Sequence, residues 1–162
     1  IQEIGRLAVF DIKGAASSVA ARVSPLCLSL PVNVNTASMN DGQKLCWVGE
    51  NHWLLIAPSS QEGQLFDDLA PNNPAFDCRV VLVSDFYAFF SVMGKQANDV
   101  IAIASPLDTR VTKFGKNGAA HSDLFGIRAL VLRHPDGFDV AVESSYAVMI
   151  SACFDKVITG RV

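Results

Sequence analysis

Residues 121–123 and Asp85 have side chains that could do acid-base or nucleophilic chemistry. His121, Ser122 and Asp123 follow one another, and a histidine beside a hydroxyl suggests an activated nucleophile. Neighbours in sequence, however, rarely reach the geometry of a catalytic triad. Asp85 follows an apolar run and could serve as a general base. An aspartate at the end of a strand also satisfies turn amides, so both roles stay open for Asp85.

Aromatic residues in predicted strands could stack on a flat ring such as a pterin, but strand aromatics also build cores and interfaces. They are Trp47, Trp53, Phe89 and Phe90. His52 lies at a predicted hairpin and His134 beside a Pro-Asp-Gly turn, so both are expected to be exposed. These residues therefore have structural explanations at least as good as functional ones.

Patterns that hold cofactors or metals are missing from the sequence. No Gly-x-Gly-x-x-Gly follows a predicted strand, and there is no phosphate-binding loop. Cys27, Cys46, Cys78 and Cys153 are far apart and form no Cys-x-x-Cys pair, which argues against zinc and favours buried thiols. We expect no catalytic, cofactor-binding or metal-binding residue in this chain.

The composition favours a globular protein with a substantial core. Half of the 162 residues are hydrophobic, 18% are charged, and the net charge is −3. Basic residues are scattered, so nucleic acid is not an expected partner. No apolar run is long enough for a membrane helix, and no leader pattern is visible, so we expect a cytoplasmic protein. The low charge suggests a surface that meets a partner, although a well-packed monomer explains it equally well.

One stretch organises the predicted fold. Tyr87–Met93 is typical of a strand because aromatic and β-branched residues dominate it. Gly94 ends it, and apolar spacing close to 3.6 predicts a helix directly afterwards. Pro106 stops that helix because proline lacks the amide donor.

The other predicted elements fall on both sides of this stretch. Ala16, Val19, Ala20 and Val23 are expected to face inward from the first helix, and Leu65, Phe66 and Leu69 from the second. The predicted strands are Arg6–Lys13, a short piece at Val32–Val34, Lys44–Val48, His52–Ala57, Cys78–Ser84, Ile127–Arg133 and Phe138–Glu143. The predicted helices are Ala15–Val23, Gln61–Leu69 and one from Ser144 or Ser145 to about Ile158.

Three further local features are predicted. Ser59 and Glu62 have the spacing of a capping box. The dense apolar run at Cys78–Ser84 indicates a buried strand. Residues 109–123 are expected to form a loop with short strand pieces.

The two halves of the chain have similar element order. The stretch from Ala8 to Gly14 resembles that from Ala88 to Gly94, and each is followed by a helix, a loop, a strand hairpin and a second helix. The polar segment Pro71–Pro74 is the expected boundary. We therefore predict a single α+β domain made of duplicated β-α-β-β-α, ferredoxin-like halves, about 1–72 and 76–162.

Several segments, in this order, resemble the gamma subunit of heterotetrameric sarcosine oxidase, which is related to the folate-binding domain of the glycine-cleavage T-protein. The segments are Val83–Phe90, which matches the pattern Val-Ser-Asp-x-Tyr-Ala-x-Phe, Ser105–Asp108, Trp47–Ala57 and the Phe138–Tyr146 junction. Lys95 departs from the proline common in the family, and residues 115–118 lack its proline-rich character.

The resemblance implies a non-catalytic subunit that packs on the alpha subunit, with beta and delta subunits in the same complex. Such a complex oxidatively demethylates sarcosine to glycine. FAD, FMN, NAD, tetrahydrofolate and zinc would belong to the other subunits, and none to this chain.

The T-protein carries a Gly-Ile-x-Asp-Asp segment with carboxylates important for one-carbon transfer. The nearest match here is Gly126-Ile127-Arg128-Ala129-Leu130, which has neither carboxylate, so the resemblance argues against independent folate chemistry. The alternatives are a stand-alone folate-binding, aminomethyltransferase-like protein, a small subunit of a related N-methyl amino acid dehydrogenase, and a scaffold domain without a metabolic role.

Overall fold

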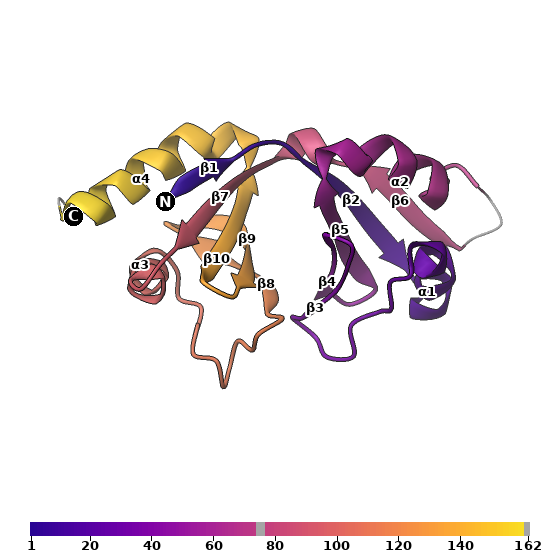
Figure 1. Ribbon diagram of the computed structural model, residues 1–162, viewed down its shortest axis with the longest axis horizontal. Helices are drawn as coiled ribbons and strands as arrows, with labels where there is room; N and C mark the ends of the chain where they lie inside the picture. Colours follow the sequence, from indigo (N-terminus) through magenta and orange to yellow (C-terminus); the bar gives the residue numbers. More distant parts are fainter. Residues whose placement is uncertain (74–76, 161–162) are drawn as a thin grey trace. The chain divides into compact units, whose positions relative to one another are not determined.

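The computed structural model describes residues 1–73 and 77–160 (Figure 1). The chain forms two compact units. We call Arg6–Ser84 the N-unit, and Asp85–Val162 together with Ile1–Gly5 the C-unit. The predicted boundary at Pro71–Pro74 lies partly outside the described residues, and the chain changes units later, after Ser84. That the two units act as one domain stays a prediction.

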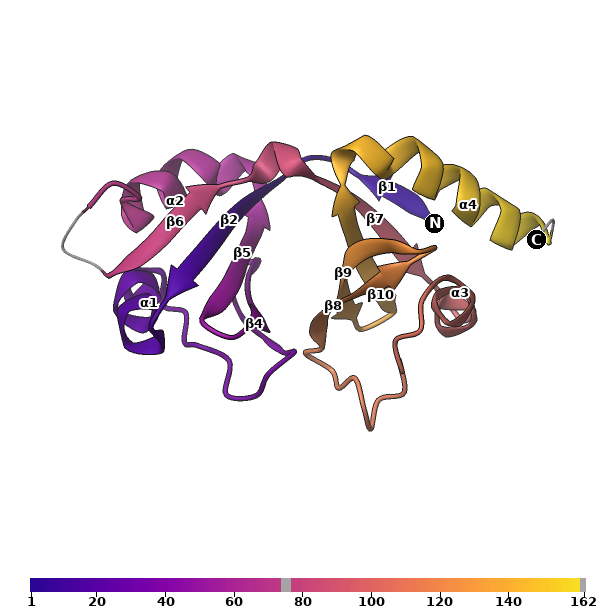
Figure 2. The same ribbon diagram turned by 180° about the vertical axis from the view of Figure 1, so that it is seen from behind.

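The N-unit contains one antiparallel five-stranded sheet in the order β3-β4-β5-β2-β6. Val19 and Val23 of α1 and Leu65 and Leu69 of α2 are buried in one apolar cluster with residues of the sheet such as Phe10. Both helices therefore cover the same face (Figures 1 and 2). The elements are β2 (Leu7–Gly14), α1 (Ala16–Val23), β3 (Ala37–Asn40), β4 (Gln43–Gly49), β5 (His52–Pro58), α2 (Glu62–Leu69) and β6 (Cys78–Leu82).

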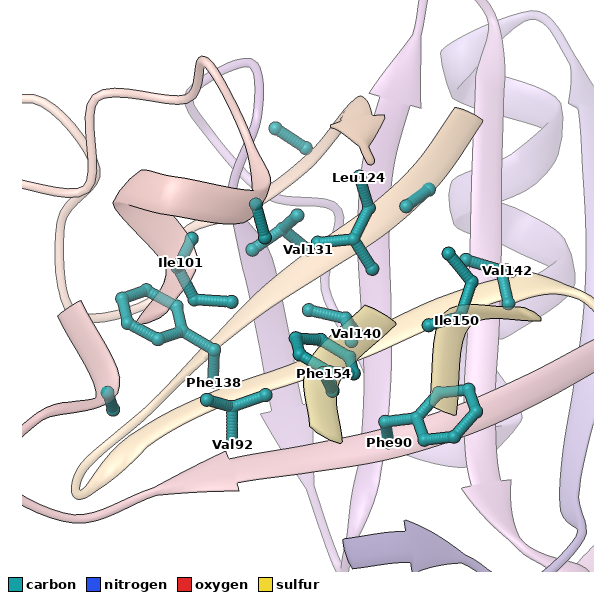
Figure 3. Packing of buried hydrophobic residues seen from close by; sticks show 14 of the residues in the cluster. Phe90, Val92, Ile101, Leu124, Val131, Phe138, Val140, Val142, Ile150 and Phe154 are labelled. Carbon is teal, nitrogen blue, oxygen red and sulfur yellow. The ribbon is translucent and has the colours of Figure 1, made fainter. Parts of the chain in front are cut away.

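The C-unit contains a second antiparallel sheet in the order β1-β7-β10-β9-β8. Ile101 of α3 and Ile150 and Phe154 of α4 pack on strand residues such as Phe90 and Phe138 (Figure 3). The elements are β1 (Gln2–Ile4), β7 (Tyr87–Met93), α3 (Ala97–Ala104), β8 (Ala119–Leu124), β9 (Ile127–His134), β10 (Gly137–Glu143) and α4 (Ala147–Thr159).

The two sheets have corresponding strand orders, with one difference in where the fifth strand comes from. In the N-unit the edge strand beside β2 is β6, which follows α2; in the C-unit the edge strand beside β7 is β1, from the start of the chain. A small backbone detail also recurs. The Gly14 amide donates to the Asn51 carbonyl (3.1 Å), and the Gly94 amide donates to the Asp136 carbonyl (2.9 Å). Each glycine thus ties the end of a long strand to the turn of the neighbouring hairpin.

The prediction of a strand at Cys78–Ser84 is correct in position but wrong in burial. The strand lies at the edge of its sheet, and Val81 and Leu82 are 42% and 36% exposed while Val80 is buried. A continuous apolar run indicates burial on both faces, but the helices of the unit leave this edge open.

Several loop predictions are also wrong. The strand expected at Val32–Val34 lies instead at Ala37–Asn40, and Val32 is 91% exposed. No strand is predicted at Gln2–Ile4, where the structure has β1, whereas β8 agrees with the short strand pieces expected within residues 109–123. Short strands like these are defined by their partners rather than by their own composition.

The inward faces of α1 and α2 are only partly as expected. Val19, Val23, Leu65 and Leu69 are buried, whereas Ala16, Ala20 and Phe66 are exposed. Arg22 is buried instead, and its Nη1 donates to the carbonyls of Leu69 (2.5 Å) and Ala70 (2.6 Å). This arginine therefore satisfies the free carbonyls at the end of α2.

The predicted capping box at Ser59 and Glu62 is wrong. Among the described residues, no side chain caps the N-terminus of α2. Glu62 instead accepts hydrogen bonds from Arg6 (Nη2 to Oε1, 3.0 Å) and from Ser84 Oγ (2.5 Å), while Ser84 Oγ accepts from the Val9 amide (3.0 Å). We call these contacts the Glu62 network. It fixes the two points at which the chain enters and leaves the N-unit.

The predicted cap of the last helix is also wrong. No side chain caps α4, which begins at Ala147 after a short 3₁₀ turn. Ser144 Oγ donates to the Asp85 carbonyl (3.1 Å), and Ser145 Oγ donates to Glu143 (2.8 Å). Both hydroxyls have tertiary or local partners that compete with the cap.

Replacing Glu62 by Gln should destabilise the protein by about 1–3 kcal/mol, because charge-assisted hydrogen bonds become neutral ones around the buried Ser84 hydroxyl. Urea unfolding followed by circular dichroism measures this loss. Glu50→Gln, at an exposed turn position, is the matched control and should change stability little. Equal effects of the two changes would show that the Glu62 network adds nothing.

Replacing Gly137 by Ala should destabilise the C-unit by about 1–3 kcal/mol or more. A Cβ there would lie 2.1 Å from the Val92 carbonyl oxygen, so the β7–β10 pairing must shift. Gly63→Ala is the control, since nothing lies within 4 Å of its Cβ position and alanine favours helix by about 0.5–1 kcal/mol. Thermal unfolding should rank the variants G63A, wild type, G137A. A G137A protein as stable as wild type would contradict the close approach.

Candidate functional site

The N-unit sheet carries charged side chains on the face opposite its helices. Successive residues of a strand point to opposite faces, so Phe10 and Ile12 of β2 face the helices and Asp11 and Lys13 face the other way. We call this other side the second face. Directly paired residues share a face, and Lys13 pairs with His52 of β5. His52 therefore also projects from the second face.

Asp11 joins His52 and Lys13 on this face. Its Oδ2 lies 2.9 Å from His52 Nε2, and its Oδ1 lies 3.6 Å from Lys13 Nζ. The His52 and Asp11 side chains are 22% and 21% exposed, so the prediction that His52 is exposed is wrong because Asp11 draws its ring against the sheet. Asp11 can orient the imidazole, but within residues 1–73 and 77–160 no hydroxyl or thiol is hydrogen-bonded to His52. The pair lacks the nucleophile of a triad.

The consecutive residues 121–123 do not form a catalytic group. They lie in β8, so Ser122 points away from the face that carries His121 and Asp123. Ser122 Oγ lies 3.0 Å from Ser105 Oγ, and His121 Nδ1 lies 3.3 Å from the Arg128 Nη2. Strand alternation is therefore the reason that these neighbours in sequence cannot cooperate.

Asp85 and His134 lie at turns. Asp85 is exposed in a short 3₁₀ segment, and its backbone carbonyl accepts from Ser144 Oγ. The His134 ring is half-buried rather than exposed, and its Nδ1 lies 3.4 Å from the Asp136 amide. These contacts are those of residues that shape turns.

The aromatic residues considered as ring-stacking candidates belong to the sheets' packed faces. Trp53, Phe89 and Phe90 are each 2% exposed. Trp47 stacks on Trp53 with ring centroids 6.2 Å apart, and it is half-buried against the N-unit cluster. Trp53, Phe89 and Phe90 are thus buried, as the core interpretation predicts, whereas the absence of a ring-stacking role stays a prediction.

The segment matched to the carboxylate motif of the T-protein forms a turn and the start of β9. Gly126 has a φ of 81° in the turn, Arg128 is exposed, and Ala129 and Leu130 are 2% and 1% exposed. The two buried positions of the segment are thus apolar, at Ala129 and Leu130. The charged residue next to them in sequence is the cation Arg128.

The cysteines are free thiols. Burial raises the pKa of Cys46 to about 12, which makes its thiolate scarce at neutral pH. No cluster of three or more potential metal ligands occurs among the described residues, and no described helix is long and apolar enough to cross a membrane.

A surface cavity of about 410 Å³ lies between the start of α3 and the β9–β10 hairpin. Its lining residues are Gly94, Lys95, Ala97, Asn98, Arg133, Pro135, Asp136 and Gly137.

One of these lining residues, Arg133, has structural partners. Arg133 Nη2 donates to the carbonyls of Thr109 and Phe114, and its guanidinium carbon lies 4.5 Å from the centroid of the Phe138 ring. Arg133 therefore anchors the loop before β8.

Comparisons with known proteins identify the class of fold. No protein-family model matches the chain, and no curated protein sequence matches it. Solved structures do match: the heterotetrameric sarcosine oxidase of Corynebacterium sp. U-96, in complex with pyrrole 2-carboxylate, aligns with a TM-score of 0.78 and 19% identity over 95% of this chain and 80% of that chain. The chain therefore has an α+β fold found in that multi-subunit oxidase.

A second solved structure has the same fold. The glycine cleavage system aminomethyltransferase T of Bartonella henselae aligns with a TM-score of 0.73 and 16% identity over 94% of this chain. Only 44% of the aminomethyltransferase chain is covered, so the present chain spans less than half of that enzyme. The resemblance seen in the sequence motifs is confirmed by these neighbours, at the level of the fold.

Asp108, in the segment Ser105–Asp108, should titrate far below an ordinary aspartate. The side chain of Arg110 donates to both carboxylate oxygens (2.5–3.1 Å) and its amide to one (3.1 Å), which lowers the pKa of Asp108 from 3.8 to about 2. Because the pKa is lowered, the interaction is complete above pH 3.8 and is lost as the pH falls through about 2.

NMR titration of the Asp108 carboxyl carbon measures this midpoint. In Arg110→Gln the midpoint should rise toward the ordinary value, whereas Lys116→Gln should leave it in place. Identical midpoints in the wild type and in R110Q would show that Arg110 is not the cause.

Proposed function

We propose that this chain is the non-catalytic gamma subunit of a heterotetrameric sarcosine oxidase and packs on the alpha subunit. The observation that carries the proposal is the fold match over 95% of this chain and 80% of the matched oxidase chain. The ordered sequence motifs support it independently. The complex would convert sarcosine to glycine by oxidative demethylation.

The side chains that could do chemistry support a role without catalysis. His121 and Ser122 point to opposite faces, and His52 has a carboxylate partner but no nucleophile among the described residues. Ala129 and Leu130, which the sequence resemblance matches to the T-protein carboxylates, are buried. A cationic one-carbon intermediate would find no acid to stabilise it on this segment.

The cofactors belong to other subunits in this proposal. FAD, FMN, NAD, tetrahydrofolate and zinc would be bound by the alpha, beta and delta chains, and this chain would act in the cytoplasm. The predicted β-α-β-β-α order of each half is one strand short, because both units follow the order β-α-β-β-β-α. This shared element order and the shared strand order support an origin by duplication of one such half, in which β1 replaced the fifth strand of the second copy.

A second candidate function is a stand-alone folate-binding, aminomethyltransferase-like protein. The observation in its favour is the fold match to aminomethyltransferase T. Calorimetry with tetrahydrofolate separates the two functions: micromolar binding by the isolated chain favours this candidate. A small subunit of a related N-methyl amino acid dehydrogenase would instead be distinguished by the substrate range of the complex.

The test of the proposal is co-expression of the tagged chain with a flavin-bearing sarcosine oxidase alpha subunit. Native mass spectrometry should show a complex containing both chains, with the flavin absorbance in the same fraction. Hydrogen peroxide should form from sarcosine only when the large subunits are present. Turnover of sarcosine by the isolated chain, or elution of the tagged chain alone under mild conditions, would contradict the proposal.

A further inference from the structure

The second face of the N-unit sheet carries basic side chains in one row across three adjacent strands. Lys13 of β2 is paired with His52 of β5 on one side and with Arg79 of β6 on the other. Paired residues share a face, so the three side chains project side by side. We call Arg79, Lys13 and His52 the basic row.

Two neighbouring cations of the row, Lys13 and Arg79, should lower the stability of the isolated sheet. Like charges directly opposite one another on neighbouring strands destabilise their pairing. Asp11 is the carboxylate beside the row, and its two oxygens contact His52 (2.9 Å) and Lys13 (3.6 Å). Arg79 is exposed and forms no ion pair within the described residues. The contacts within the N-unit therefore do not explain why the cation Arg79 lies beside the cation Lys13.

The basic residues of the N-unit divide into two groups. Arg6 binds Glu62, and buried Arg22 binds carbonyls at the end of α2, so both have structural roles. The other three, Lys13, Lys44 and Arg79, lie on the second face. Lys13 is paired with Asp11 there, and Lys44 also has an interaction partner. A protein with a net charge of −3 thus collects positive charge on one side of one sheet.

We infer that the basic row, together with exposed Val81, binds an acidic segment of a partner protein. Neighbouring strands lie about 5 Å apart, so the row extends over about 10 Å, which is longer than a single carboxylate can contact. A run of Asp or Glu side chains matches that length. Val81 projects from the same face of β6 and is 42% exposed, so it offers an apolar contact beside the charges.

This inference rests on the proposed function only for the identity of the partner, which would be a larger subunit of the oxidase. The surface itself is defined by this chain alone. Binding of a model acidic peptide can therefore succeed even if no oxidase complex forms, and the two failures can be told apart.

The test uses the full chain and a fluorescently labelled deca-glutamate peptide as the probe, followed by anisotropy. Lys13→Glu combined with Arg79→Glu should weaken binding by about three- to tenfold or more, as expected for the loss of two exposed ion pairs. Binding should also weaken when the salt concentration rises from about 50 to about 300 mM, because exposed charges are screened.

The matched control is Lys113→Glu combined with Lys116→Glu, which makes the same charge change at exposed positions of the C-unit and should leave the probe affinity within about twofold. Equal loss in the control, equal binding of a deca-glutamine peptide, or no binding by the wild type would overturn the inference.

Two other results would also overturn it. Displacement of the probe by equimolar glutamate or inorganic phosphate would indicate a small-anion site. Cations on edge strands also oppose aggregation, so a K13E/R79E protein that self-associates but keeps its probe affinity would assign the row to that role.

Discussion

Pairing of β2 with β5 on one side and β6 on the other is the interaction on which the N-unit depends. It places Phe10 and Ile12 against α1 and α2, where they form the apolar cluster. The same register necessarily sends Asp11 and Lys13 to the opposite face. A shift by one residue would turn both charged side chains toward the apolar cluster and both apolar side chains toward the second face, so the composition of the two faces is fixed together.

Polar side chains with backbone partners connect the remaining elements. Arg22 binds carbonyls at the end of α2, Ser84 links the Val9 amide to Glu62, and Arg133 binds carbonyls of the loop before β8. Buried polar groups require such partners because unsatisfied ones are costly. These three side chains therefore hold separate segments of their units in place.

The candidate site could be predicted only in part. His121 and Ser122 point to opposite faces of the sheet because successive strand residues alternate. This could be predicted only if residues 119–124 were recognised as a strand, and the mixed polarity of these residues indicated a loop instead. Asp11 and Lys13 have the two-residue spacing that puts them on one face, whereas their contact with His52 depends on the pairing of β2 with β5. The cap predicted at Ser59 is absent because Glu62 is bound instead by the charged Arg6 and by the Ser84 hydroxyl, both far away in sequence.

The sequence by itself determined the long strands, the helices and the α+β class, because apolar periodicity is a local property. Only the tertiary structure decided that Cys78–Leu82 is an exposed edge and that Gln2–Ile4 completes the sheet of the other unit. It also decided which charges share a face. Strand order and register arise from contacts between distant segments, and those contacts leave no periodic trace in either segment alone.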